Sequence, residues 1–342
     1  MKFDFAIGNP PYQEETENNG RQTPVYNRFM DEAYKVADCV ELITPARFLF
    51  NAGQTPKAWN EKMLNDEHFK VMQYETDASK IFSNTDIKGG VAITIRDKRK
   101  RYGKIEEFIT SENLRNIVNR IRPAIQHTIT EIHYNRSSYR LTDDLYADFP
   151  ELLGKVKQSE RLSIGSNIFE KLEKVLFDKK PTDDSDYIQI FGRDDSVRSY
   201  KWISSKYIAN HDNLDKWKVF VAKSNGTGEF GEVMSDFEIA QPKCVSTQTF
   251  ISFGSFEERK EAVALSKYLK TKFVRALLGI CRVTPDNARK EVWKYVPLQD
   301  FSDNSDIDWD TIIKNIDKQL YKKYGLSEEE VSFIETNVKE ME

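Results

Sequence analysis

A short apolar run near the start of the chain ends abruptly in two consecutive prolines. Residues 3–7 (FDFAI) have the length and composition of a buried strand, and Gly8 and Asn9 lead from it into Pro10 and Pro11. Proline fixes φ at about −65° and has no backbone N–H, so two in a row hold a loop in nearly one shape and remove two donors. The sequence therefore predicts a buried strand followed by a rigid loop whose carbonyl groups are available as acceptors.

Helical and strand patterns alternate over the first third of the chain. The expected helices lie over 26–37 and 58–65, and the expected strands over 40–44, 71–75 and 91–96. Pro45 ends the second strand, and Gly89-Gly90 precedes the last one. This alternation predicts an open α/β sheet over residues 1–110.

The remaining two thirds of the chain show a different pattern. Residues 111–182 look helical and irregular, and a Thr-Asp-Asp-Ser-Asp cluster at 182–186 indicates a boundary. Short β-like runs follow at 187–191, 200–203, 218–222 and 245–252. The chain ends in helices, with a capping box from Ser327 to Glu330. We therefore predict three parts, 1–110, 111–182 and 183–342.

Composition limits the class of protein. The chain has 342 residues, of which 39% are hydrophobic and 31% are charged, as in ordinary globular proteins. No apolar stretch reaches the roughly 20 residues of a membrane span, and no leader pattern is visible, so an intracellular protein without a membrane partner is expected. The net charge of −4 argues against indiscriminate coating of nucleic acid. A local basic groove is still possible, because the lysines and arginines gather at 96–104 and 267–290.

Residues that bind metals or cleave nucleic acid form no recognisable motif. The cysteines make no CxxC pair and the four histidines are scattered, so no metal site is predicted. Asp286 and Glu291 fail the acid-acid-lysine pattern of nucleases, because Trp293 stands where lysine is needed. We therefore predict three plain thiols and no cleavage centre.

The loop Asn9-Pro10-Pro11-Tyr12 has the groups needed to activate an amino group on a base. The exocyclic N6 of adenine is a poor nucleophile, because its lone pair is delocalised into the ring. Two acceptors, the Asn9 side-chain oxygen and the Pro10 carbonyl, would localise that pair and orient it for attack on a methyl group. The Tyr12 ring would stack on a base swung out of the duplex, a contact worth about 1–3 kcal/mol. The alternative is a plain proline-rich turn.

The chain resembles the N6-adenine DNA methyltransferases of restriction–modification systems, in particular the large enzymes in which methylation and restriction share one polypeptide. The segments that carry the resemblance are FDFAIGNPPYQ (3–13), VELITPARF (40–48), KIFSNTDIKGGVAITIRD (80–97) and the helical end at 309–335. It implies a partial Rossmann-like methyltransferase sheet followed by a mixed α+β target-recognition domain from about residue 183.

The resemblance also implies roles, a cofactor and a partner. Asn9, Pro10, Pro11 and Tyr12 would be catalytic, and Phe82 would pack on the flipped adenine opposite Tyr12. A core phenylalanine beneath the Gly89-Gly90 hairpin is the other interpretation of Phe82. The methyl donor would be S-adenosylmethionine and the partner double-stranded DNA. The mixtures of aromatic, basic and amide side chains that could read it lie at 198–206, 243–250 and 267–275.

The donor site is expected to be largely absent from this chain. In the family a glycine-rich turn precedes the catalytic loop, and only residues 1–8 precede it here. Residues 226–231 (GTGEFG) match GxGxxG, but too few residues follow for a crossover helix, so a turn or a DNA-facing loop is predicted. We expect an upstream segment or a partner chain to hold the donor.

Two other functions fit parts of the sequence. One is a catalytically silent DNA-binding specificity module from a split or truncated gene. The other is methylation of a protein glutamine or of RNA by the same loop chemistry, which the long β-rich second half disfavours.

Overall fold

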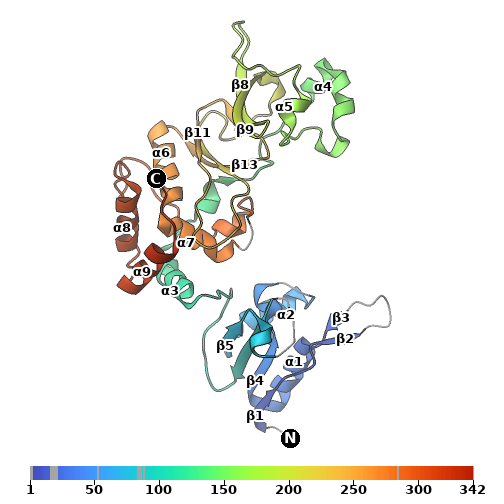
Figure 1. Cartoon of the computed structure of the whole chain (residues 1–342), viewed down its shortest axis with the longest axis vertical. Coiled ribbons are helices and arrows are strands. Elements are labelled where there is room, and N and C mark those ends of the chain that lie inside the picture. The colour runs from blue at the N-terminus through green and yellow to red at the C-terminus, as the bar shows by residue number, and fades with distance from the viewer. Residues whose placement is uncertain are drawn as a thin grey trace. The chain divides into compact units, whose positions relative to one another are not determined.

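The polypeptide divides after Thr110 into two units, Met1–Thr110 and Ser111–Glu342. The computed structural model describes residues 3–15, 22–51, 54–82, 87, 89–282 and 285–341. The helices and strands of each unit are labelled in Figure 1.

The first unit contains a mixed four-stranded sheet. Its strand order is β1-β4-β6-β5, with β1 parallel to β4 and with β6 antiparallel to both β4 and β5. The strands are β1 Phe3–Gly8, β4 Ala37–Pro45, β5 Phe69–Glu75 and β6 Val91–Asp97, and a small ribbon pairs β2 Gln13–Glu15 with β3 Gln22–Pro24. The helices are α1 Tyr26–Val36 and α2 Lys57–Leu64. All the strands and helices predicted for this region are therefore present.

One face of this sheet holds the core of the first unit. Val40 and Leu42 of β4 pack there with Met30 of α1 and with Phe48 and Trp59, whose ring centroids are 5.2 Å apart. Phe29, which the helical spacing predicted on the buried face of α1, is instead exposed.

The other face of the sheet is largely uncovered by the described residues. Phe3, Phe5 and Ile7 alternate along β1 and are 51%, 63% and 80% exposed. The same face continues through Glu41, the direct partner of Ile7, and through the half-buried Ile43 of β4 and Ile93 and Ile95 of β6. We call the six apolar residues of this face the open face. The prediction of a buried strand over residues 3–7 is therefore wrong for the described residues, because Phe3, Phe5 and Ile7 stay largely exposed even with the Arg99 guanidinium 5.5 Å from the centre of the Phe5 ring.

The second unit contains two further sheets. One has the order β11-β10-β13-β7 and the other β12-β8-β9. Their strands are β7 His133–Tyr134, β8 Tyr187–Asp194, β9 Val197–Ser204, β10 Trp217–Ala222, β11 Glu238–Ala240, β12 Cys244–Ser246 and β13 Phe250–Phe256. The helices are α3 Glu112–Ile121, α4 Asp144–Asp148, α5 Ile168–Lys171, α6 Arg259–Lys270, α7 Lys272–Cys281, α8 Ile313–Lys323 and α9 Glu328–Asn337. The chain thus has a mixed α/β architecture with several sheets.

A single hydrophobic cluster joins residues 139–175 to the strands that follow them. Leu145 and Leu172 pack in one core with Ile190 and Phe191 of β8 and with Phe220 of β10. The amphipathic stretch predicted around residue 172 is shorter than expected, since α5 ends at Lys171. Within the described ranges, no helix is both long enough and apolar enough to cross a membrane.

The C-terminal helices are stabilised by a capping box at the start of α9 and by a buried carboxylate of α8 that binds the start of α7. The predicted capping box is confirmed, because Ser327 Oγ accepts from Glu330 N and the Glu330 carboxylate accepts from Ser327 N. Asp317 of α8 accepts from the N–H groups of Lys272 and Phe273 at the start of α7, at 3.1 and 2.9 Å. Burial raises the pKa of Asp317 to about 6, although these two N–H groups lower it.

We expect this buried carboxyl to make stability depend on pH between about 4 and 6. Because the folded chain holds the Asp317 proton more tightly than the unfolded chain, this contribution is complete below the ordinary value of 3.8 and is lost as pH rises through about 6. Relative to Asp317→Asn, the native protein should lose on the order of 2–3 kcal/mol across that window. Urea midpoints of both proteins at several pH values measure this, and parallel pH curves would contradict it.

Candidate active site

The Asn-Pro-Pro-Tyr loop lies at the carboxyl end of β1. The Asn9 side chain is exposed and Pro10 is half-buried. The carbonyl of Tyr12 accepts from Val25 N at 3.1 Å, which ties the end of the loop to the start of α1. The loop is therefore anchored at both ends, by β1 before it and by α1 after it, while Asn9 faces solvent.

Tyr12 is held between solvent and the core. Its ring packs against the hydrophobic cluster under α1, and its hydroxyl is buried without a hydrogen-bond partner in the described part of the chain. Burial raises the pKa of Tyr12, so the phenol stays neutral at physiological pH. The buried part of the Tyr12 side chain supports the loop, and the rest of the ring is accessible to solvent.

Segments from two of the other resemblance motifs, 40–48 and 80–97, meet at the same edge of the sheet. Ala46 N, just after β4, donates to the carbonyl of Gly90 at 3.0 Å, just before β6. Gly90 has a φ of +74°, and a Cβ there would lie 2.3 Å from the carbonyl oxygen of Glu75. Only glycine fits this position, because its backbone passes directly against β5. Since β1 and β4 are parallel, their carboxyl ends, and with them Asn9 and Ala46, lie on one edge.

Phe82 follows a short turn on the chain between β5 and β6. It is half-buried, and its N–H donates to the carbonyl of Ala78 at 2.8 Å. Residues 83–86 and 88 of the same motif lie outside the described residues. Stacking of Phe82 opposite Tyr12 stays a prediction.

The GxGxxG segment at residues 226–231 is filled by the chain's own carboxylate. Glu232 accepts from the N–H groups of Thr227 and Gly228 at 2.9 and 3.1 Å, and it pairs with Arg282 at 2.6 Å. A Cβ on Gly226 would lie 2.1 Å from Glu232 Oε2, so the carboxylate occupies the concave side of the turn. Burial raises the pKa of Glu232, but these N–H groups and the Arg282 guanidinium outweigh it and leave the pKa lowered. This segment is a structural turn, because the donors that would bind a phosphate are already bonded.

The glycine-rich turn at residues 226–231 therefore does not fit S-adenosylmethionine. The candidate glycine-rich turn is occupied, and no group of His, Cys, Asp and Glu side chains among the described positions could hold a metal ion. The Asn9 side-chain oxygen and the carbonyl groups of the Asn-Pro-Pro-Tyr loop are hydrogen-bond acceptors, which is the kind of group that would bind an amino group.

One of the three candidate DNA-reading segments is structural. In 267–275, Lys267 donates to the carbonyls of Trp309 and Thr311, and Lys272 pairs with Glu335 at 2.6 Å. Arg275 is buried and donates to backbone carbonyls. These cations hold the C-terminal helices together. The alternation of basic and aromatic residues in the sequence does not show whether a cation faces DNA or bonds within the protein.

Some features of the site have no clear signal in the sequence. The oxygens Tyr12 Oη, Asn27 Oδ1 and Thr44 Oγ1 are buried and lack a partner in the described ranges. Buried polar atoms are usually paired, so these three are exceptions in the unit that carries the loop. The sequence gives the type of residue at each position, but it does not show whether a buried polar atom has a hydrogen-bond partner.

Comparisons with known proteins agree with the motif assignment. Residues 1–82 match the family model of the Eco57I restriction-modification methylases. A Mycoplasma pneumoniae protein described as an uncharacterized adenine-specific methylase is 28% identical over 99 residues, which are 28% of this chain and 24% of that protein.

Two solved structures are similar over most of the chain at low identity. The type IIG restriction endonuclease BpuSI matches 94% of this chain and 49% of its own, with 12% identity and a TM-score of 0.34. The type IIL restriction-modification enzyme MmeI, solved in complex with DNA, matches 97% and 56%, with 11% identity and a TM-score of 0.31. The chain thus spans about a quarter of the curated relative and about half of each solved structure. Residues 1–82, which hold the Asn-Pro-Pro-Tyr loop, are thus similar to the Eco57I restriction-modification methylases, and 99 residues of the chain are similar to a protein described as an adenine-specific methylase.

Proposed function

We propose that this chain carries the catalytic loop and the target-recognition domain of a site-specific DNA adenine-N6 methyltransferase. The observation that carries the proposal is the Asn-Pro-Pro-Tyr loop at the carboxyl edge of the parallel β1–β4 pair, with Asn9 exposed and the loop tied to α1. The family match over residues 1–82 supports the same reaction.

In this proposal the loop prepares the amino group of a flipped adenine. The Asn9 side-chain oxygen and the Pro10 carbonyl accept from N6, which localises its lone pair. The half-buried Tyr12 ring offers a stacking face, and Phe82 is the proposed partner on the other side of the base. The two prolines keep the acceptors in place, so little reorganisation is needed when the base arrives.

The methyl donor, S-adenosylmethionine, would be held mainly by an upstream segment or a partner chain. The open face supports this part of the proposal. Parallel strands are normally covered on both faces, yet Phe5 and Ile7 of β1 are largely exposed and the outer edge of β1 has no described partner. A further strand and its helices would cover this apolar surface and complete a Rossmann-like sheet.

The test measures donor binding, DNA binding and methylation by the chain alone. We expect duplex DNA to bind, S-adenosylmethionine to give no heat in a calorimetric titration, and no labelled methyl group to reach DNA. Coexpression with the product of the coding sequence immediately upstream of the Met1 codon should then restore methylation. Methylation by the chain alone would confirm the reaction and overturn the missing donor site.

The alternative is a catalytically silent DNA-binding module. The exposed Asn9 and the uncovered open face do not distinguish it from the proposal, but coexpression does. DNA binding that never becomes methylation with the upstream product would favour the module. Transfer of the methyl group to RNA or to a protein glutamine, with DNA unmodified, would rule out both the DNA methyltransferase and the silent DNA-binding module.

A further inference from the structure

The β8–β9 hairpin of the second unit ends in a strained two-residue turn. Asp195 and Ser196 have φ values of 45° and 69°, as in the type I′ turns that glycine and asparagine prefer. Val197, directly after the turn, is 66% exposed. The hairpin end projects beyond the neighbouring strands of its unit (Figure 1). Strained backbone that is kept at an exposed tip points to a binding role.

Two arginines lie directly opposite each other just behind this turn. Arg193 of β8 pairs with Arg198 of β9 in the antiparallel register, so both side chains leave the same face of the hairpin. Like charges in this arrangement destabilise a sheet. Neither guanidinium pairs with a carboxylate among the described residues. Arg193 Nη1 donates to the carbonyl of Ser196 at 3.1 Å, and Arg198 lies 5.9 Å from the centre of the Phe250 ring. These contacts orient the two groups and leave both charges uncompensated.

The two arginines differ in this respect from Lys201 within the hairpin and from Lys206 and Lys243 at the end remote from the turn, which all pair with carboxylates. Lys201 bonds to Asp178 and Asp194 at 2.5 and 2.9 Å. Lys206 lies 2.7 Å from Asp148, and Lys243 lies 2.8 Å from Asp186. The uncompensated positive charge of this hairpin is thus concentrated at Arg193 and Arg198.

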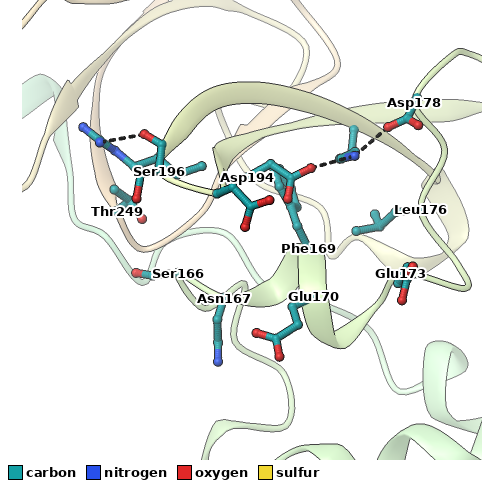
Figure 2. Close-up of a pocket in the computed structure, with 13 residues that line it drawn as sticks. Ser166, Asn167, Phe169, Glu170, Glu173, Leu176, Asp178, Asp194, Ser196 and Thr249 are labelled. Atoms are coloured by element: carbon teal, nitrogen blue, oxygen red, sulfur yellow. Dashed lines mark hydrogen bonds and ion pairs between the residues drawn. The ribbon is translucent and has the colours of Figure 1, made fainter.

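The opposite face of the hairpin is acidic. Asp194 points into a pocket of about 670 Å³ that Glu170, Glu173 and Asp178 also line, as Figure 2 shows. Asp195 at the turn, Arg193 and Lys201 also line this pocket. The acids outnumber the cations there, so a polyanion would be repelled from the pocket side. Of the two faces, only the one with the arginine pair suits a polyanion.

We propose that Arg193 and Arg198 form a clamp for the phosphate backbone of duplex DNA. This inference rests on the proposed function and names the site at which the recognition domain holds the duplex. Guanidinium groups bind phosphate through paired N–H donors, and a phosphate between two arginines removes their mutual repulsion. Arg193 and Arg198 then fix the register of the hairpin on the duplex, while other side chains read the bases.

The experiment measures the affinity of the full chain for duplex DNA as a function of salt concentration. Arg193→Ala and Arg198→Ala should each weaken binding about tenfold at low salt and lower the magnitude of the salt slope by about 1. The matched controls are Lys206→Ala and Lys243→Ala, whose charges are already paired and whose salt slopes should equal the native one. Arg198→Lys keeps the positive charge and removes the planar guanidinium from the Phe250 ring, and it should keep the native salt slope. A loss caused by the missing charge is thereby separated from a loss caused by the missing packing on Phe250.

Each outcome decides between the clamp and the proposed function. If the native chain binds no duplex DNA, the proposed function itself fails. A second outcome is that the native chain binds duplex DNA while the double variant Arg193→Ala/Arg198→Ala, shown to be folded by its circular dichroism spectrum, keeps the native salt slope. That result overturns the clamp and leaves the proposed function standing. Equal binding of duplex RNA with the same dependence on both arginines would overturn the assignment to DNA.

Discussion

Replacing Asn9 by alanine should lower the rate of methyl transfer by about 100- to 1,000-fold and leave DNA affinity nearly unchanged. In the proposed reaction the Asn9 oxygen is needed most in the transition state, where it would stabilise the developing tetrahedral N6, and a preorganised hydrogen-bonding group of this kind is worth about 3–4 kcal/mol. Single-turnover methylation with saturating donor, in the enzyme reconstituted with its donor-binding part, isolates this step. A gel-shift titration of the same variant gives the DNA affinity.

The control for this substitution is Asn65→Ala. Asn65 is an exposed asparagine of the same unit, just after α2, whose side chain only donates to the Glu61 carbonyl. It should leave both the rate and the DNA affinity unchanged. If Asn9→Ala instead weakens DNA binding strongly and keeps the native rate per bound complex, the loop is a structural turn.

Removing Glu232 should destabilise the second unit by about 3–5 kcal/mol. The side chains of Glu232 and Arg282 are only 10% and 4% exposed, so Glu232→Ala leaves a buried guanidinium without its carboxylate and also frees the N–H groups of Thr227 and Gly228. Urea unfolding followed by tryptophan fluorescence measures the loss. A deficit of this size would show that the GxGxxG turn is held by an internal ion pair.

A surface pair provides the comparison for this loss. Lys323 and Asp306 lie 2.6 Å apart with side chains 30% and 60% exposed, and Asp306→Ala should cost less than about 1 kcal/mol. Glu232→Gln keeps the shape and removes the charge, so it separates packing from ion pairing. A Glu232→Ala variant as stable as Asp306→Ala would mean that water replaces the carboxylate in the turn.

The local elements of the first unit could be predicted because each follows from a short pattern. Pro45 ends β4 and Gly90 precedes β6, and both boundaries are set within a few residues. The burial of β1 could not be predicted, because FDFAI gives the apolar character of a strand but not what packs on it. Exposure of Phe5 and Ile7 depends on elements that no pattern within residues 3–7 describes.

The candidate site shows the same limit. The Asn-Pro-Pro-Tyr loop was recognisable from four adjacent letters, whereas the contact between Ala46 and Gly90 depends on β6 lying between β4 and β5. Pairing order follows from long-range packing, which a single sequence does not encode locally. Likewise, Arg193 and Arg198 become neighbours only through the register of the hairpin, and the acid that fills the GxGxxG turn is visible only in three dimensions.

The outer edge of β1 affects how the protein must be handled. An edge strand with unpaired backbone groups and alternating phenylalanines is a template for any other extended chain, including a second copy of itself. In a purified preparation, self-association through this edge would compete with assembly onto the donor-binding part that the proposed function requires. The yield of active enzyme should therefore be higher when both parts are synthesised together than when they are mixed at high concentration, and dilution before mixing should recover part of the difference.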